Sequence, residues 1–493
     1  MASLLSAAGL TSCSMPASLQ EGTVSGQAGV PERISIVINS QGTRFPQGLH
    51  ENNNPYLKYI EGNTGLDVQV ILPPQEGYQH TVEAMLNNEQ VPDMLSVTSD
   101  VWIARQVQRG ALQPLDELLQ QYGPDLLRQI PQEAWDRVRF QGKIYGIPSM
   151  NSIPGVELMY VRKDWLNRLG LKAPRTLEEY REVMRAFTQE DPDGNGKHDT
   201  YGLAMTNHLY RSAPFFGAFG VQLNQWTERQ GQLVYSNILP ETKEALLFLA
   251  SLYREGWIDP EFPLMNHKNL EEGVEQGRVG LFSAAWHDTR GMIARSRELD
   301  PKAEWMPLEY PTGPKGDHGV YAAPSVKSYQ VIPAKSAGAG AVVRLLNFIG
   351  GPGYETLSLG FPNEVWVRKE GRIVSNFAEH DKHQYRGIYG SLAEVADPEL
   401  LRDRLDSYGE EFRLYDNLQR IERNLIRDAY TGAPTESMEL YSESLLALQR
   451  VFIQIIMGTV PPEAFDAYVR EWKQGGGDAI TEEVNRQLLS SRK

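Results

Sequence analysis

A short loop at residues 191–199 carries side chains suited to hold a metal ion. It reads Asp-Pro-Asp-Gly-Asn-Gly-Lys-His-Asp, so oxygen-bearing side chains stand at its first, third, fifth and ninth positions. A hard cation such as Ca²⁺ takes about six to eight oxygen ligands, and alternate residues of a tight loop aim theirs at one point. The loop therefore predicts a structural calcium ion. The expected ligands are Asp191, Asp193, Asn195, the backbone carbonyl of Lys197, and Asp199.

The same loop also allows an interpretation without a metal. Gly196 stands at the sixth position and permits the sharp turn of an EF-hand loop, but Gly202 replaces the bidentate Glu of its twelfth position. The loop is therefore not an EF-hand. The alternative is a solvated turn, because Asp, Asn and Gly favour turns whether or not a cation is present.

The chain carries none of the common motifs of nucleophilic or metal-dependent catalysis. It has no Gly-x-Ser-x-Gly elbow, no His-Glu-x-x-His helix and no Walker loop. His380 and His383 have the spacing of two ligands on a helix, but no third ligand is evident, and a solvated polar loop is preferred. Paired carboxylates indicate nothing in a chain with 63 acidic residues.

Length and charge narrow the class of protein. A chain of 493 residues is too long for one ordinary domain, so at least two lobes are expected. The net charge of -15 argues against nucleic-acid binding, because phosphate groups must be neutralised by a basic surface. No apolar run approaches the roughly 20 residues of a membrane-spanning helix. We expect a monomer that contacts a membrane only through an anchor.

Cys13 is the single cysteine, and its context indicates such an anchor. Leu10-Thr11-Ser12-Cys13 resembles a bacterial lipobox, in which the peptide is cut before the cysteine and that residue is lipidated. The basic segment that normally opens a signal peptide is missing before Leu4. A late start codon or an incidental cysteine in a disordered N-terminus would explain this. Residues 14–30 are rich in small residues and predict a flexible tether.

The elements that would position a site begin with an alternation of strands and helices. Strands are expected at 33–38, 67–72 and 92–97, and helices at 51–63 and around 82–86. This order predicts a parallel sheet with helices on both faces. Ligands bind at the carboxyl ends of such strands, which places Gln41, Asp100 and Trp102 at a candidate site. Further strands are expected at 156–161 and 279–282, further helices at 176–188, 241–255 and 339–349, and a mostly helical C-terminal third.

Several segments together resemble one protein family. They are Val-Pro-Asp-Met at 91–94, Leu-Gln-Pro-Leu-Asp at 112–116, Gly-Lys-Ile-Tyr-Gly-Ile-Pro at 142–148, Leu-Met-Tyr-Val-Arg-Lys-Asp-Trp-Leu at 158–166, and the runs 172–179, 277–282 and 457–468. Their order and spacing are similar to those of the sugar-type extracellular solute-binding proteins of bacterial ABC importers. Within that family, the chain resembles the long lipoproteins that include alginate-oligosaccharide-binding proteins.

The resemblance implies a type II periplasmic-binding-protein fold, with two α/β lobes joined by crossing strands that act as a hinge. We place the crossings near residues 150, 318 and 365. Residues 1–30 are then the signal remnant and tether, 31–150 with 318–365 form lobe one, and 151–317 with 366–493 form lobe two. The relatives also carry the calcium loop, with a Glu directly after its last Asp. Thr200 stands there instead, which leaves the last ligand open.

The resemblance further implies which side chains contact a sugar. Trp286 matches an aromatic residue that stacks on sugar, Tyr160 a cleft tyrosine, and Asp100 an acceptor for hydroxyl groups. The alternatives are a packing tryptophan, a core tyrosine and a helix cap. Position alone adds Gln41, Trp102, Asn207, His208, Tyr321 and Arg386. An acidic sugar would require a basic partner, for which Arg44, Arg211, Arg290 and Arg386 are candidates.

These features lead to one expected function. A lipid-anchored protein on the extracellular face of a bacterial membrane captures a carbohydrate by closing its lobes, and importer subunits in the membrane recognise the closed form. No bond is made or broken. The alternatives are an extracellular glycosidase or lyase, and a purely structural surface lipoprotein. Two carboxylates about 5–10 Å apart across a sugar would favour the glycosidase.

Overall fold

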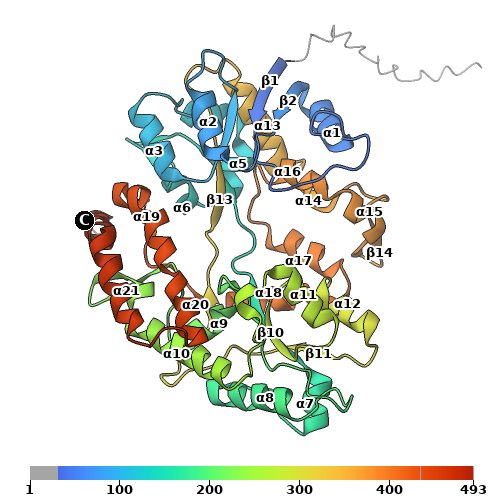
Figure 1. Cartoon of the computed structure of the whole chain (residues 1–493). Coiled ribbons are helices and arrows are strands. Elements are labelled where there is room, and N and C mark those ends of the chain that lie inside the picture. The colour runs from blue at the N-terminus through green and yellow to red at the C-terminus, as the bar shows by residue number, and fades with distance from the viewer. Residues whose placement is uncertain (1–31, 433–434, 492–493) are drawn as a thin grey trace, which may run out of the picture.

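The computed structural model describes residues 32–432 and 435–491, and it arranges them in two lobes (Figure 1). Each lobe is built around its own cluster of buried apolar side chains. The two-lobed α/β architecture predicted from the sequence is thereby confirmed. The predicted tether and Cys13 lie outside the described residues.

The first lobe is built on a five-stranded sheet in the order β2-β1-β3-β13-β6. β1 pairs in parallel with β2 and β3, whereas β13 is antiparallel to β3 and β6, so only part of the sheet has the predicted direction. The strands are β1 (Glu32–Val37), β2 (Leu66–Ile71), β3 (Met94–Val97), β6 (Ile147–Met150) and β13 (Val326–Val331). The helices around it are α1 (Pro55–Thr64), α2 (Tyr78–Leu86), α3 (Asp100–Gln108), α4 (Asp116–Tyr122), α5 (Pro124–Gln129), α6 (Gln132–Asp136), α13 (Ala339–Gly350), α14 (Tyr354–Leu359) and α16 (Gly387–Gly390).

The second lobe has a smaller, antiparallel sheet in the order β10-β7-β11. All six side chains of β7 are buried, as expected for a central strand covered on both faces. Its strands are β7 (Glu157–Arg162), β10 (Leu281–Ala285) and β11 (Trp305–Pro307), and a short ladder joins β12 (Val320–Tyr321) to β16 (Leu425–Ile426). Its main helices are α7 (Lys163–Leu169), α8 (Leu177–Gln189), α9 (Ala213–Gly217), α10 (Pro240–Arg254), α11 (His267–Glu275), α12 (Met292–Leu299), α17 (Pro398–Asp406), α18 (Leu414–Glu422), α19 (Glu436–Leu448), α20 (Arg450–Met457), α21 (Ala464–Trp472) and α22 (Asp478–Ser491).

Local signals explain where these elements begin and how closely they pack. Helix α8 starts with a capping box, in which Thr176 and Glu179 satisfy each other's backbone N–H groups. Strand β10 follows Gly280, at which a Cβ atom would collide with the ring of Phe187. A glycine is therefore required there, because it lets the strand pack directly against Phe187 and Trp165.

Three connections pass between the lobes and are hydrogen-bonded to one another. The first comprises residues 151–156 and the second residues 322–325. The N–H of Ala323 donates to the carbonyl of Pro154 (2.8 Å), and the N–H of Asn151 donates to the carbonyl of Ser325 (2.8 Å). The third connects at Glu394, whose carbonyl accepts from Met150 N–H (2.8 Å). Three adjacent connections that cross at one place form a hinge about which the lobes can rotate.

The third crossing lies later in the chain than the predicted position near 365. Tyr385, Ile388, Tyr389, Leu392, Ala393 and Val395 are buried in the core of the first lobe. The segment before them forms the hairpin β14 (Trp366–Lys369) and β15 (Arg372–Ser375) and the helix α15 (Phe377–Lys382), and the hairpin packs in a small core of its own. The boundary at 365 is therefore wrong, because the chain returns to the first lobe after this excursion.

Candidate functional site

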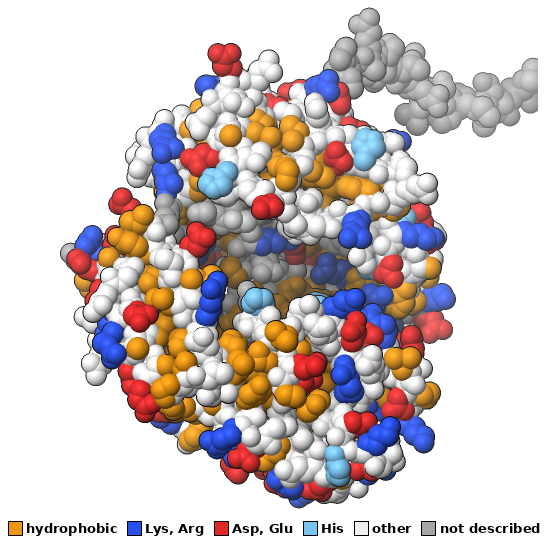
Figure 2. All heavy atoms as spheres, viewed as in Figure 1, with side chains coloured by type: hydrophobic (Ala, Val, Ile, Leu, Met, Phe, Trp, Pro, Cys, Tyr) orange, Lys and Arg blue, Asp and Glu red, His pale blue; other side chains and the backbone are white. Residues whose placement is uncertain are grey.

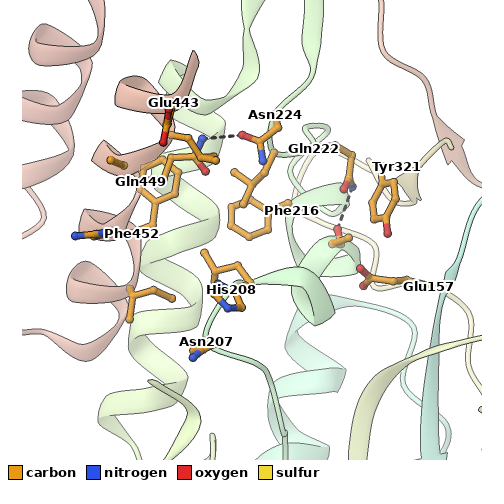
Figure 3. A pocket seen from close by; sticks show the side chains of 17 residues that line it. Glu157, Asn207, His208, Phe216, Gln222, Asn224, Tyr321, Glu443, Gln449 and Phe452 are labelled. Carbon is orange, nitrogen blue, oxygen red and sulfur yellow. Dashed lines mark hydrogen bonds between the residues drawn. The ribbon is translucent and has the colours of Figure 1, made fainter. Parts of the chain in front are cut away.

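Two adjoining cavities open beside the hinge on the second lobe. One has a volume of about 620 Å³ and the other about 310 Å³, and both are bordered by Glu157, His208 and Tyr321. Glu157 comes from β7, His208 from the loop that precedes α9, and Tyr321 from β12 (Figure 3). Helices α19 and α20 form the opposite wall of the larger cavity. Segments distant in sequence thus meet at one hollow next to the crossings.

The wall of the larger cavity mixes apolar rings with amide groups. Phe216 and Phe452 supply rings, and Gln449 donates a hydrogen bond to Asn224 (2.7 Å, Figure 3). Asn207 also borders this cavity, and its side-chain oxygen is buried without a hydrogen-bond partner among the described residues. Rings with planar polar groups are the combination that binds sugar faces and hydroxyl groups.

Glu157 is the most unusual titratable group of this site, and sequence analysis missed it. Its side chain is 2% exposed and accepts a hydrogen bond from the hydroxyl of Ser283 (2.7 Å). Burial raises the pKa of the Glu157 carboxyl to about 7, and the Ser283 bond and the charge of Arg211 offset only part of that rise. Near neutral pH the carboxyl is therefore divided between its protonated and charged forms.

A third cavity, of about 400 Å³, lies between the lobes. Gln41 and Arg386 border it from the first lobe, while Arg404 and Tyr408 border it from the second. In Figure 2 the face between the lobes is hollowed, and Lys and Arg side chains gather around the right-hand part of the hollow, close to the elements labelled α15 and α17 in Figure 1.

Five of the predicted contact residues line these cavities. They are Asn207, His208 and Tyr321 in the larger cavity, and Gln41 and Arg386 in the interlobe cavity. Trp286 follows directly after β10 and is half-buried, with its ring centroid 5.1 Å from that of His287. Trp286 borders none of the three cavities, and its contact with a sugar stays a prediction.

Three other predicted contacts are engaged elsewhere. Tyr160 is buried in the second core, where Asn417 donates to its hydroxyl (2.7 Å), and Trp102 is buried in the first core. Asp100 forms an ion pair with Arg137 (2.8 Å), and the cap of α3 is Ser99. Placing the Tyr160 and Trp102 side chains at a cleft surface was therefore wrong, because both lie on core-facing positions of their elements.

The 191–199 loop is held by hydrogen bonds to its own carboxylates. The carboxylate of Asp191 accepts from the N–H groups of Asn195 and Gly196 (both 3.1 Å), and the Asn195 amide bridges Asp193 (2.8 Å) and Asp199 (3.1 Å). Desolvation and the nearby carboxylates of Asp191 and Asp199 raise the pKa of Asp193. Against desolvation, hydrogen bonds from the backbone N–H groups of Gly196 and Asn195 and from Asp193 lower the pKa of the neighbouring Asp191. Several carboxylates gathered in one turn fit a loop that receives positive charge.

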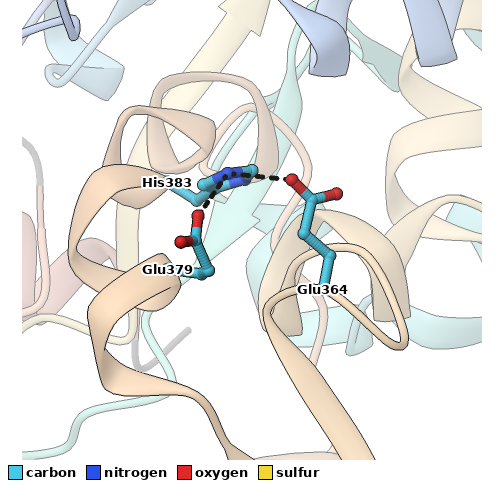
Figure 4. Close-up of side chains that lie close together, drawn as sticks. All are labelled: Glu364, Glu379 and His383. Carbon is cyan, nitrogen blue, oxygen red and sulfur yellow. Dashed lines mark ion pairs between the residues drawn. The ribbon is translucent and has the colours of Figure 1, made fainter.

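A separate cluster on the first lobe brings together Glu364, Glu379 and His383 (Figure 4). Among the described residues, it is the one set of three acidic or histidine side chains whose ligand atoms all lie within 4.8 Å. The imidazole Nε2 is 3.4 Å from Glu364 and 3.9 Å from Glu379, and Nδ1 is 2.9 Å from the hydroxyl of Tyr56. Lys382 already pairs with Glu379 (2.8 Å), so we interpret the cluster as ion pairs.

Comparison with known proteins identifies the family. Residues 48–356 match the family described as bacterial extracellular solute-binding protein. The chain belongs to this family. It is 25% identical to lipoprotein LipO of Bacillus subtilis (strain 168) over 482 residues, which cover 90% of each chain. It is 24% identical to the polygalacturonan/rhamnogalacturonan-binding protein YtcQ of the same organism over 451 residues, with 88% of each chain covered.

Solved structures show the same fold. The alginate-binding protein AlgQ2, in a structure without calcium ion, superposes with a TM-score of 0.69 at 17% sequence identity. The match covers 93% of this chain and 98% of that one. Within the part of the chain that the structure describes, no helix is both long and apolar enough to cross a membrane.

Proposed function

We propose that this solute-binding protein captures an oligosaccharide between its lobes and presents it to the membrane subunits of a bacterial ABC importer. The observation that carries the proposal is the set of cavities beside a hinge of three crossing connections, lined by Tyr321, Asn207 and other amide and aromatic side chains. A relative that covers 88% of this chain is named as a polygalacturonan/rhamnogalacturonan-binding protein. The protein is an extracellular, lipid-anchored carrier, and Cys13 is its proposed lipidation site.

The mechanism follows from the hinge. In the open form each lobe presents part of the site, and a ligand that contacts both lobes stabilises the closed form. The ligand shifts this equilibrium only by the difference between its affinities for the two forms. Contacts on both sides of the cleft are therefore what couple binding to closure, and no covalent step is required.

The proposal is tested by titrating the protein calorimetrically with neutral and acidic oligosaccharides and then recovering each sugar for mass analysis. We expect at least one sugar class to bind and to be recovered intact. A carboxyl with a raised pKa, such as Glu157, is also what a general acid needs, so recovery of the sugar is informative. Cleaved sugar would move the assignment to a glycosidase or lyase. If no sugar of the panel binds, the proposal that the ligand is an oligosaccharide is contradicted.

Tyr321 offers a direct test of the larger cavity. We expect Tyr321→Ala to weaken oligosaccharide binding by about 10-fold or more, because an aromatic ring that borders two adjoining cavities provides a large contact face. Tyr321→Phe keeps the ring and should retain most of the affinity. Dissociation constants from calorimetry check both. Equal affinity of Tyr321→Ala and the unaltered protein would place the sugar elsewhere.

We propose further that the loop at 191–199 binds calcium through Asp191, Asp193, Asn195, the carbonyl of Lys197 and Asp199. The converging acceptors and the raised pKa of Asp193 support this assignment. The guanidinium of Arg168 lies against Gly194 and supplies one nearby positive charge. The ion would hold the connection that follows α8, with Thr200 buried and donating to the Phe187 carbonyl (2.7 Å) rather than pointing at the loop.

Calcium at ten times its dissociation constant should raise the free energy of unfolding by about 1.4 kcal/mol, because it binds only the folded loop. A chelator should remove that gain, and Asp193→Ala should abolish the response to calcium. Asp67→Ala, which removes an exposed aspartate from β2, serves as the control and should respond like the unaltered protein. Urea unfolding with calcium or chelator measures the difference. An unchanged midpoint would mean that the loop is a solvated turn.

A further inference from the structure

The interlobe cavity carries more positive charge than its own acidic side chains balance. Its lining includes three cations, Lys327, Arg386 and Arg404, and a single carboxylate, Glu394. Lys327 and Glu394 pair with each other, so this pair is neutral. The two arginines remain, in a protein whose net charge is -15. We call this cavity, with these four residues, the basic interlobe pocket.

Arg386 is a buried charge that no acidic side chain of the described residues pairs with. Arg386 is 6% exposed, and its guanidinium donates to the carbonyls of Ser358 (3.2 and 3.3 Å) and His383 (2.9 Å). Its Nη2 also lies 3.3 Å from Nδ1 of His380. Neutral acceptors hold the guanidinium in place but leave its charge uncompensated, which is costly in a buried site.

Arg404 faces the same cavity from helix α17 of the second lobe and is half-buried. No hydrogen bond or ion pair joins its guanidinium to any residue that the structure describes. At longer range its charge adds to that of Lys327 in lowering the pKa of Glu394, against the effect of burial. Arg404 is therefore a cation that is held at the cavity but not used by the fold.

His380 reports the positive field inside the pocket. Burial, together with the charges of Arg386, Arg290 and Arg404, lowers its pKa to about 4, and Asp381 opposes this only in part. Because an arginine always donates, Nδ1 of His380 must accept from Arg386, so Nε2 carries the proton and faces the hydroxyl of Tyr408 (3.4 Å). The pocket therefore holds a neutral histidine beside its two arginines.

We infer that the basic interlobe pocket receives a carboxylate of the bound oligosaccharide, so that the cargo is an acidic, uronate-containing sugar. This inference rests on the proposed function and names the class of sugar. Guanidinium groups bind carboxylates through paired hydrogen bonds, and such bonds are stronger than those between neutral groups. Gln41 and Tyr408, on opposite sides of the pocket, can serve the neighbouring hydroxyl groups.

The placement of the charges also couples the sugar to closure. Arg386 belongs to the first lobe and Arg404 to the second, so closing an empty pocket brings like charges together. A carboxylate between them converts this repulsion into attraction. An acidic sugar therefore gains affinity specifically in the closed form, which is the condition for a ligand to drive closure.

The test uses trigalacturonate and alginate trisaccharides, together with their methyl esters, which keep the sugar and remove the charge. Residues 31–493 are titrated calorimetrically with each acid and each ester. The Arg404→Gln and Arg404→Lys variants are titrated in the same way. Because the Arg404 guanidinium forms no hydrogen bond or ion pair with any described residue, both variants should fold, and their circular dichroism checks this.

We expect an acid to bind at least about 10-fold more tightly than its ester, and Arg404→Gln to remove most of this preference, while Arg404→Lys keeps most of it. An ester that binds as tightly as its acid would overturn the inference and leave the proposed function standing. Equal weakening of acid and ester binding by Arg404→Gln would also overturn the inference and leave the proposed function standing. If neither these sugars nor the neutral panel bind, the proposed function itself fails.

Discussion

The Glu157→Gln substitution is expected to change the free energy of unfolding more favourably at pH 8 than at pH 4.5, by up to about 3 kcal/mol. The carboxyl has an ordinary pKa of 4.5 when unfolded and about 7 when folded. Between these values the folded state holds a proton that the unfolded state has lost. The free energy of unfolding therefore falls as pH rises from about 4.5 to 7, and this loss is fully present above pH 7. A glutamine side chain cannot ionise, so the Glu157→Gln variant escapes this loss.

Urea unfolding of both proteins at pH 4.5, 6 and 8 measures the effect as a difference that grows with pH. The Gln side chain keeps an oxygen that can accept from the Ser283 hydroxyl, so the packing of the site is preserved. Glu133→Gln, which alters an exposed glutamate of α6, is the control and should give a small, constant difference. A Glu157→Gln difference that stays constant with pH would show that folding does not raise the pKa of the carboxyl.

Arg162→Ala should lower the free energy of unfolding by about 3–5 kcal/mol, the largest loss that we expect from one substitution. The Arg162 side chain is 2% exposed and donates to Asp164 (2.6 and 2.8 Å) and Asp300 (3.0 Å). It also lies 4.7 Å from the ring centroid of Trp165 and 5.8 Å from that of Trp305. The substitution removes these contacts and leaves two carboxylates without their shared partner at the edge of β7.

A matched control distinguishes burial from ion pairing as such. Arg185 also pairs with two carboxylates, those of Glu182 (2.7 Å) and Glu190 (2.8 Å), but on the surface of α8. Exposed pairs contribute little, so Arg185→Ala should cost less than about 1 kcal/mol. Urea unfolding of the two variants side by side tests the contrast. Equal losses would mean that burial adds nothing to the Arg162 interactions.

Element positions were predicted well wherever the apolar pattern was strong. The expected helices at 176–188, 241–255 and 339–349 correspond to α8, α10 and α13 within one residue at each end. The strand expected at 279–282 is shifted and forms at 281–285, because Val279 and Gly280 pair instead with Tyr201 across an irregular bridge. Pattern alone could not show that partner, which lies far away in sequence.

Site residues were harder to predict, because the sequence does not say which face of a strand meets the cleft. Tyr160 alternates with core residues on a strand whose side chains are all buried, so no period-two pattern distinguished a cleft face. Glu157, three residues earlier on the same strand, was the group at the cavity, and its signal was a charged residue in an otherwise apolar run.

The basic interlobe pocket shows the same limit. Arg386 was identified as a candidate, but Lys327 follows the second crossing on β13 and Arg404 follows the third crossing on α17. That crossing was misplaced near 365 because residues 366–382 form a hairpin and helix between two parts of the first lobe. Distance along the chain therefore concealed the charges that meet there.

The most direct test of capture between the lobes is small-angle X-ray scattering of the protein with and without the sugar that binds best in calorimetry. Closure about the hinge brings the lobes together, so the radius of gyration should fall when the sugar is added. The sugar should then be recovered intact. A radius of gyration that stays the same or rises at saturating sugar would contradict capture by closure, even if the sugar binds.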